Sequence, residues 1–125
     1  MSKSFPSDSF MDASVADAGH ELERLIQIMA QLRDPETGCA WDVQQTPATV
    51  APYAIEEAYE VADAIEREAW DETADELGDL LLQVVFQSRI AEEKDRFDFA
   101  EVTRRIADKM VRRHPHVFGE AQEIR

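Results

Sequence analysis

The chain has 125 residues, of which 44% are hydrophobic and 8% aromatic, a composition typical of one folded domain rather than a disordered protein. Its formal net charge is −14 at pH 7, and the acidic excess lies in residues 1–88, so we expect neither nucleic acid nor an anionic membrane surface as a partner. A single cysteine excludes an intramolecular disulfide and a multi-cysteine zinc site.

The N-terminal residues 1–16 are predicted to form a flexible lead-in, because they contain few apolar anchors. The sequence contains no apolar signal core and no run of 18 apolar residues, so we predict a cytoplasmic protein. The first helix is predicted from about Asp17 to Arg33, where leucine, isoleucine and methionine recur at spacings of three and four. Turn-forming residues at 34–38 end it.

Three more helices are predicted downstream, and no strand-like alternation appears, so the expected fold class is all-α. The second helix should span 52–66, since proline is tolerated in a first turn but not deeper. The third should be capped by Asp71 and extend to Lys94. The fourth, at 99–113, follows Asp98 as its N-cap.

The third predicted helix is apolar on nearly every side. A helix of that kind must be covered by other elements on more than one side. Four helices in a chain of this length cannot easily supply that cover, so we predict an oligomer.

Eleven carboxylates lie between Glu56 and Asp79, and Arg67 is the only basic residue among them. Five of the eleven interrupt the apolar pattern where the second and third predicted helices should pack, and lie three or four residues apart in two groups: Glu56, Glu57 and Glu60, then Glu76 and Asp79. Such residues share a helix face, where like charges repel one another. Carboxylate oxygens without cysteine or a suitable histidine favour Mg²⁺ or Mn²⁺. A solvated acidic surface is the alternative for any single pair.

Gly78 lies between two of these acidic residues, Glu76 and Asp79. Glycine inside a helix costs about 1 kcal/mol relative to alanine. Its presence predicts that some other group approaches the backbone closely at this point.

Basic residues gather near the C-terminus, at Arg104, Arg105, Lys109, Arg112 and Arg113. They could stabilise the C-terminal end of their helix or bind phosphate groups. Next to a metal centre, the second role suggests a polyphosphate substrate. Trp41 could pack into the core or offer a flat surface to a nucleobase.

The acidic pattern E-E-x-x-E at 56–60, followed by E-x-x-D at 76–79, resembles the MazG family of nucleoside triphosphate pyrophosphohydrolases. The similarity runs from about Leu25 to Phe118 and includes Cys-Ala-Trp-Asp, Glu-Leu-Gly-Asp-Leu-Leu and Arg-Arg-His-Pro-His-Val-Phe. It implies an all-α, MazG-like bundle of four to five helices that is completed by homodimerisation, with a dimer of dimers as a variant. The domain would span 17–118 and be followed by a short tail at 119–125.

The resemblance also implies roles for particular residues. Mg²⁺, or Mn²⁺ in its place, would be bound by Glu57, Glu60, Glu76 and Asp79. Either Glu56 or Glu57 would act as the base, and Lys109 would stabilise charge on the leaving pyrophosphate. Candidate substrate contacts are Trp41, Lys109, Arg112 and Arg113.

Two positions depart from the family's usual pattern, because Ala40 and Pro47 replace a proline and a histidine. This difference leaves base recognition open. The implied activity is hydrolysis of nucleoside triphosphates to monophosphate and pyrophosphate. The alternatives are a narrow dUTP or dCTP pyrophosphatase and a non-catalytic helical module that binds a basic partner through its acidic surface.

Overall fold

The computed structural model describes residues 9–119, and that part of the chain contains helices and no strand. The helices in order are α1 (Ser9–Leu32), α2 (Ala40–Gln44), α3 (Pro47–Glu66), α4 (Trp70–Glu93), α5 (Phe99–Arg113) and α6 (Pro115–Phe118). The predicted all-α class is confirmed, whereas the two short helices α2 and α6 were not expected. No helix within 9–119 is long and apolar enough to cross a membrane.

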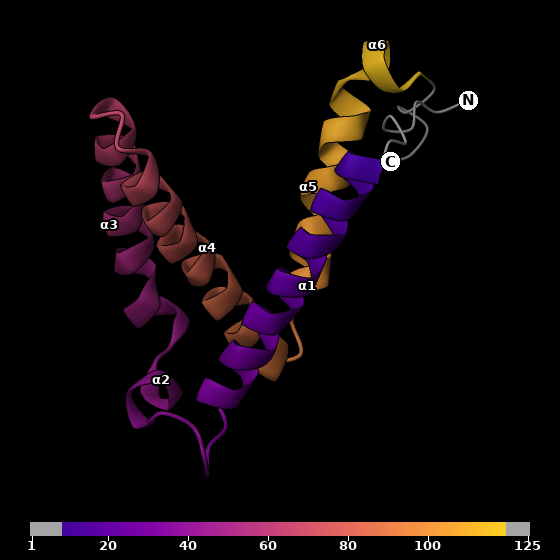
Figure 1. Ribbon diagram of the computed structural model, residues 1–125. Helices are drawn as coiled ribbons and strands as arrows, with labels where there is room; N and C mark the ends of the chain where they lie inside the picture. Colours follow the sequence, from indigo (N-terminus) through magenta and orange to yellow (C-terminus); the bar gives the residue numbers. More distant parts are fainter. Residues whose placement is uncertain (1–8, 120–125) are drawn as a thin grey trace.

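The molecule has the outline of a V (Figure 1). Helices α3 and α4 pack against each other as an antiparallel hairpin that forms one arm, and α1 and α5 lie on the other arm. Helix α4 contacts both α1 and α5, and thereby joins the arms. The main buried cluster lies at this junction and consists of Met29, Val50, Val85, Phe86 and Ile90.

Helix α1 begins at Ser9, eight residues before the predicted start near Asp17, so that predicted start is wrong. The flexibility of the lead-in stays a prediction. The stretch 9–16 contains two alanines, which have the highest helix propensity, and Val15 within it is 66% exposed. The rest of the predicted lead-in and residues 120–125 of the predicted tail lie outside the described residues. After the helix, glycine is required at Gly38, because a Cβ there would collide with the carbonyl oxygen of Leu32.

Helix α3 begins at Pro47, so the predicted start near Pro52 is wrong. The early start comes from a capping box, in which Thr46 and Thr49 each donate a backbone N–H to the other's side-chain oxygen. Pro52 therefore lies inside the helix, where it leaves the Ala48 carbonyl without its usual donor. Both residues are exposed, so water can satisfy that carbonyl.

Helix α4 begins at Trp70, and its N-cap is Ala69 rather than the predicted Asp71. Asp71 lies in the first turn, where a negative charge favours the helix dipole. Arg67 bridges the turn between α3 and α4 by pairing with Asp63 and Glu72. One cation in the turn therefore pairs with two of the eleven carboxylates.

The predicted bounds of α5 are confirmed, including its cap. The side chain of Asp98 accepts a hydrogen bond from the backbone N–H of Glu101 at 2.9 Å. The helix ends at Arg113, immediately before the His114-Pro115 step.

Helix α4 is not covered on all sides by the described part of the chain. Leu77, Leu81 and Val84 follow each other at spacings of four and three and are all exposed, Leu77 by 48%. Ile55 and Tyr59 on α3 are exposed as well. The apolar surface that led us to predict an oligomer is therefore present.

Candidate metal and substrate site

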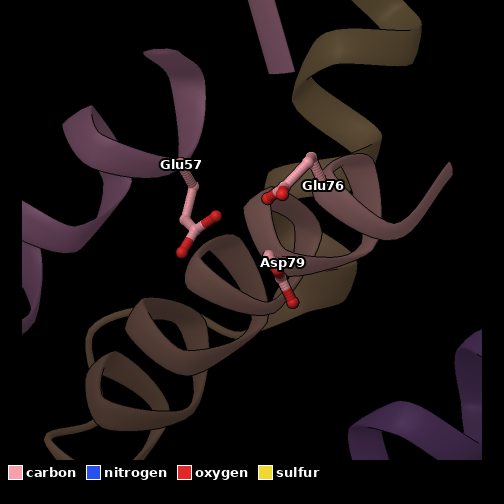
Figure 2. A group of neighbouring side chains, drawn as sticks. All are labelled: Glu57, Glu76 and Asp79. Carbon is pink, nitrogen blue, oxygen red and sulfur yellow. The ribbon is translucent and has the colours of Figure 1, made fainter. Parts of the chain in front are cut away.

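Three of the predicted acidic residues come together between α3 and α4. One carboxylate oxygen from each of Glu57, Glu76 and Asp79 lies within 4.8 Å of the others. Figure 2 shows Glu57 extending from α3 toward α4, which carries the other two. Glu76 and Asp79 are adjacent on one face of α4, since they are three residues apart.

The buried oxygen of Glu57 indicates what this cluster can hold. Glu57 is half-buried, and its Oε1 has no hydrogen-bond partner within the described part of the chain. A buried carboxylate oxygen is costly unless it is paired or binds a cation. The three available donors are all carboxylate oxygens, which are the ligands that hard divalent cations prefer. The residues present therefore fit a divalent metal ion.

The electrostatics of Glu76 support the same conclusion. Burial raises the pKa of Glu76 above its usual value of 4.5, and the nearby charge of Glu60 raises it further. The charges of Asp79 and Glu57 act in the same direction. A carboxylate whose ionisation is opposed by neighbouring negative charges is one that a cation would stabilise.

Glu60 and Glu56 occupy the edge of the site. Glu60 influences the pKa of Glu76, but it is exposed and is not among the three residues whose oxygens converge. Glu56 is also exposed, and its negative charge is not among those that shift the pKa of Glu76. Their assigned roles, as fourth ligand and as accessory base, stay predictions.

The basic residues of α5 are not brought to the acidic cluster within one chain. Lys109, Arg112 and Arg113 lie at the C-terminal end of α5, on the arm of the V opposite the α3–α4 hairpin (Figure 1). None of the three forms an ion pair with another residue in 9–119. Arg104 and Arg105, in contrast, both bind Glu101.

Trp41 is partly packed and partly exposed, so both roles considered for it stay open. It lies on α2, and its ring packs edge to face against Tyr53 and the buried Phe86. The distances between ring centroids are 6.2 Å and 6.4 Å. The residue nevertheless remains 50% exposed. Tyr53 was not predicted, although its position four residues before Glu57 places both on one face of α3.

Arg33 fixes the segment that carries Trp41, and this role was also missed. Its Nη1 donates to the carbonyl oxygens of Asp42 at 2.7 Å and Gln45 at 2.9 Å, while Nε donates to Glu93 at 3.1 Å. The guanidinium also lies over the ring of Phe86, and the side chain is only 8% exposed. Arg33 therefore ties α2 to both α1 and α4.

The predicted close approach at Gly78 is not made by the described part of this chain. A Cβ at Gly78 would meet no atom within 4 Å, and the residue is exposed on α4.

Comparison with known proteins identifies relatives of the whole region that contains the acidic cluster. The MazG nucleotide pyrophosphohydrolase domain matches residues 45–118. The chain is 56% identical over 102 residues to a nucleoside triphosphate pyrophosphohydrolase of Escherichia coli, an alignment that covers 82% of this chain and 39% of the relative. It is 49% identical over 105 residues to nucleoside triphosphate pyrophosphohydrolase/pyrophosphatase MazG of Thermotoga maritima, covering 84% and 41%.

A more distant relative is the nucleoside triphosphate pyrophosphohydrolase of Mycobacterium tuberculosis, which is 37% identical over 99 residues, covering 78% of this chain and 30% of the relative. The chain thus spans about two fifths of the length of the Escherichia coli and Thermotoga maritima proteins. The matched family region contains α3, α4 and α5, and so includes all three converging carboxylates.

Proposed function

The chain belongs to the MazG nucleotide pyrophosphohydrolase family, and on that premise we propose that it hydrolyses nucleoside triphosphates to a nucleoside monophosphate and pyrophosphate. The observation that supports this most directly is the convergence of Glu57, Glu76 and Asp79 between α3 and α4. A triphosphate and these carboxylates repel each other, so they can meet only with a cation between them. We take that cation to be Mg²⁺, with Mn²⁺ as a substitute.

The chemistry at the site divides between the cation and the side chains. A divalent cation would supply neutralisation of the phosphate oxygens and activation of water. Glu57 and the two acidic residues of α4 would hold it, and the exposed Glu60 would complete the set. Glu56 is exposed beside Glu57, so either carboxylate could accept the proton from the attacking water.

The arrangement of the basic residues supports a homodimer. Lys109, Arg112 and Arg113 are remote from the acidic cluster in one chain, so their proposed contacts with the phosphates would be made by a second copy. A second copy would also cover the exposed Leu77 and Leu81 of α4. A dimer of dimers would use further exposed apolar surface. Light scattering at micromolar concentration should give at least the dimer mass, and a clean monomer would contradict this part of the proposal.

Product analysis tests the proposed reaction. The chain is incubated with Mg²⁺ and each common NTP and dNTP, and the products are separated. We expect monophosphate and pyrophosphate, and release of diphosphate and orthophosphate would contradict the proposed bond. Glu57→Gln should abolish the reaction, whereas Glu66→Gln removes an exposed carboxylate at the end of the same helix and should leave it intact.

Exposed aromatic side chains favour a pyrophosphohydrolase with a narrow preference for one base. Trp41 and Tyr53 offer partly exposed rings beside the acidic site, and such rings can discriminate among bases. A dUTP or dCTP pyrophosphatase would show one strongly preferred base in a competition panel, and equal rates would remove this version. In either case, the enzyme would act in the cytoplasm and clear noncanonical or excess nucleotides.

A further inference from the structure

Gln83 carries an unsatisfied polar atom next to the acidic cluster. Its side-chain oxygen Oε1 is buried and has no hydrogen-bond partner within residues 9–119. A buried acceptor left in this state costs about 1–3 kcal/mol. One turn later on the same helix, Gln87 donates its amide to the Pro47 carbonyl at 3.0 Å. The packing of α3 on α4 therefore satisfies Gln87 and leaves Gln83 open.

The register of α4 places Gln83 between two parts of the site. Spacings of three and four put Glu76, Asp79, Gln83 and Phe86 on one side of the helix. At 1.5 Å per residue, Gln83 lies about 6 Å along the axis from Asp79, and Phe86 lies about 10 Å from it. Phe86 contacts Trp41, which in turn contacts Tyr53. Gln83 therefore separates the carboxylates from the aromatic group.

The order of these groups matches the order of groups in a nucleotide. Phosphates would lie at the carboxylates, a base would lie at the aromatic rings, and the sugar joins the two. Phosphate oxygens accept hydrogen bonds and cannot satisfy the Oε1 of Gln83, whereas a sugar hydroxyl can donate to it. The Gln83 side chain as a whole is only half-buried, so its amide can turn toward a bound molecule.

We propose that Gln83 accepts a hydrogen bond from a sugar hydroxyl of the bound nucleotide, with the base against Trp41 and Tyr53. This inference rests on the proposed function, because it takes a nucleoside triphosphate as the ligand. It makes Gln83 a determinant of sugar specificity. Arg33 holds Trp41 in place for the same ligand through its bonds to the α2 carbonyl groups.

Binding of nonhydrolysable nucleotides tests the inference independently of turnover. Calorimetry with the full chain and Mg²⁺ compares α,β-methylene nucleoside triphosphates that carry both sugar hydroxyls with their 2′-deoxy and 3′-deoxy counterparts. In the unaltered protein, loss of one hydroxyl should weaken binding by about 2- to 10-fold, the range for one neutral hydrogen bond. Equal affinity for all three sugars would overturn the inference without any variant.

Gln83→Leu provides a second test of the inference, and Gln87→Leu is the matched control. Gln83→Leu should weaken binding of the fully hydroxylated nucleotide by the same factor and leave the deoxy analogue that lacks the contacted hydroxyl unchanged. Gln87→Leu removes a structural hydrogen bond and should affect all three nucleotides alike. Affinity for Mn²⁺ alone should not change in either variant. A uniform loss across the sugars in Gln83→Leu would show a structural role only.

The outcomes for the two proposals can be separated. If the unaltered protein binds with the expected hydroxyl dependence but releases no pyrophosphate from any triphosphate, the proposed reaction fails and the role of Gln83 stands. If it releases pyrophosphate while affinity is independent of the sugar, the role of Gln83 fails and the reaction stands.

Discussion

The two halves of helix α4 lie in opposite environments. Its C-terminal half lies at the junction of the V, where Phe86 and Ile90 are buried and the Glu93 carboxylate is paired with Arg33. Its N-terminal half carries Glu76 and Asp79, which face the carboxylate of Glu57, and none of the three forms an ion pair with a basic side chain in 9–119. One helix therefore has a half that stabilises the fold and a half that carries two clustered carboxylates, Glu76 and Asp79, whose mutual repulsion opposes it.

This difference suggests where the stability and the function of the chain reside. Apolar burial and hydrogen bonds to charged groups at the junction are favourable without any ligand. Clustered carboxylates and exposed leucines at the other half become favourable only when a cation or a second copy is bound. The variants below separate the two halves.

Phe86→Ala should produce the largest effect. The Phe86 side chain is 3% exposed and contacts both Trp41 and Arg33, so its truncation leaves a cavity at the junction. We expect the free energy of unfolding to fall by about 3–5 kcal/mol in urea titrations. Val15→Ala, at an exposed position of α1, should change it by less than about 0.5 kcal/mol. Similar losses in the two variants would contradict a core centred on the junction.

Arg33→Met should follow, lowering the free energy of unfolding by about 2–3 kcal/mol. It removes the guanidinium that bonds Glu93 and the carbonyl groups of Asp42 and Gln45. Unfolding in urea measures the loss. The emission of Trp41 in a Trp70→Phe background reports whether α2 moves. The double variant with Glu93→Gln should lose less than the sum of the single changes. Full additivity would show that the pair is not coupled.

Features encoded over a few residues could be predicted from the sequence. The rows of carboxylates follow from spacings of three and four, and the Asp98 cap of α5 follows from one turn of helix. The start of α3 was misplaced because Pro52 was assigned to the first turn, and the capping box that starts the helix at Pro47 uses Thr49 where glutamate or glutamine is usual. The error is local, and it arises from one residue choice.

Features that depend on packing between distant segments could not be predicted. Arg33 and Glu93 are 60 residues apart, and nothing in either local pattern indicates that they pair. The position of Lys109 depends on the direction in which α5 leaves α4, which is set at the junction. The converging carboxylates could be predicted because they lie on two helices that are adjacent in the sequence and pack as a hairpin. The distance from Lys109 to these carboxylates depends on how α5 packs, which no local pattern indicates.

Glu76→Gln should act on the other half of α4. Removal of one ligand should lower the affinity for Mn²⁺, measured by calorimetry, by about 10- to 100-fold or more. Mutation of a residue that only hydrogen-bonds to a metal ligand already lowers metal affinity by about that factor. The metal-free variant should be at least as stable as the unaltered chain, because the remaining carboxylates repel one less charge. Unchanged Mn²⁺ affinity would show that the cluster is a solvated acidic surface. Glu66→Gln is the matched control.

The smallest effects should be opposite pH dependences in the two halves, seen in the metal-free protein. The hydrogen bond from Arg33 lowers the pKa of Glu93 below 4.5 in the folded state. Its stabilisation is therefore present above 4.5 and is lost as the pH falls through the lowered pKa. Burial and neighbouring charges raise the pKa of Glu76, so its penalty is absent below 4.5 and develops as the pH rises through the raised pKa.

Urea unfolding across a pH series should therefore separate the two carboxylates. Glu93→Gln should flatten the acid side of the stability profile, where the unaltered chain loses its Arg33 pair. Glu76→Gln should flatten the profile above 4.5, where the unaltered chain gains a repelling charge. Added Mn²⁺ should remove the second dependence and leave the first, because only the carboxylates of the cluster would face the cation. If both variants changed the same limb of the profile, the two halves of α4 would not differ as the structure indicates.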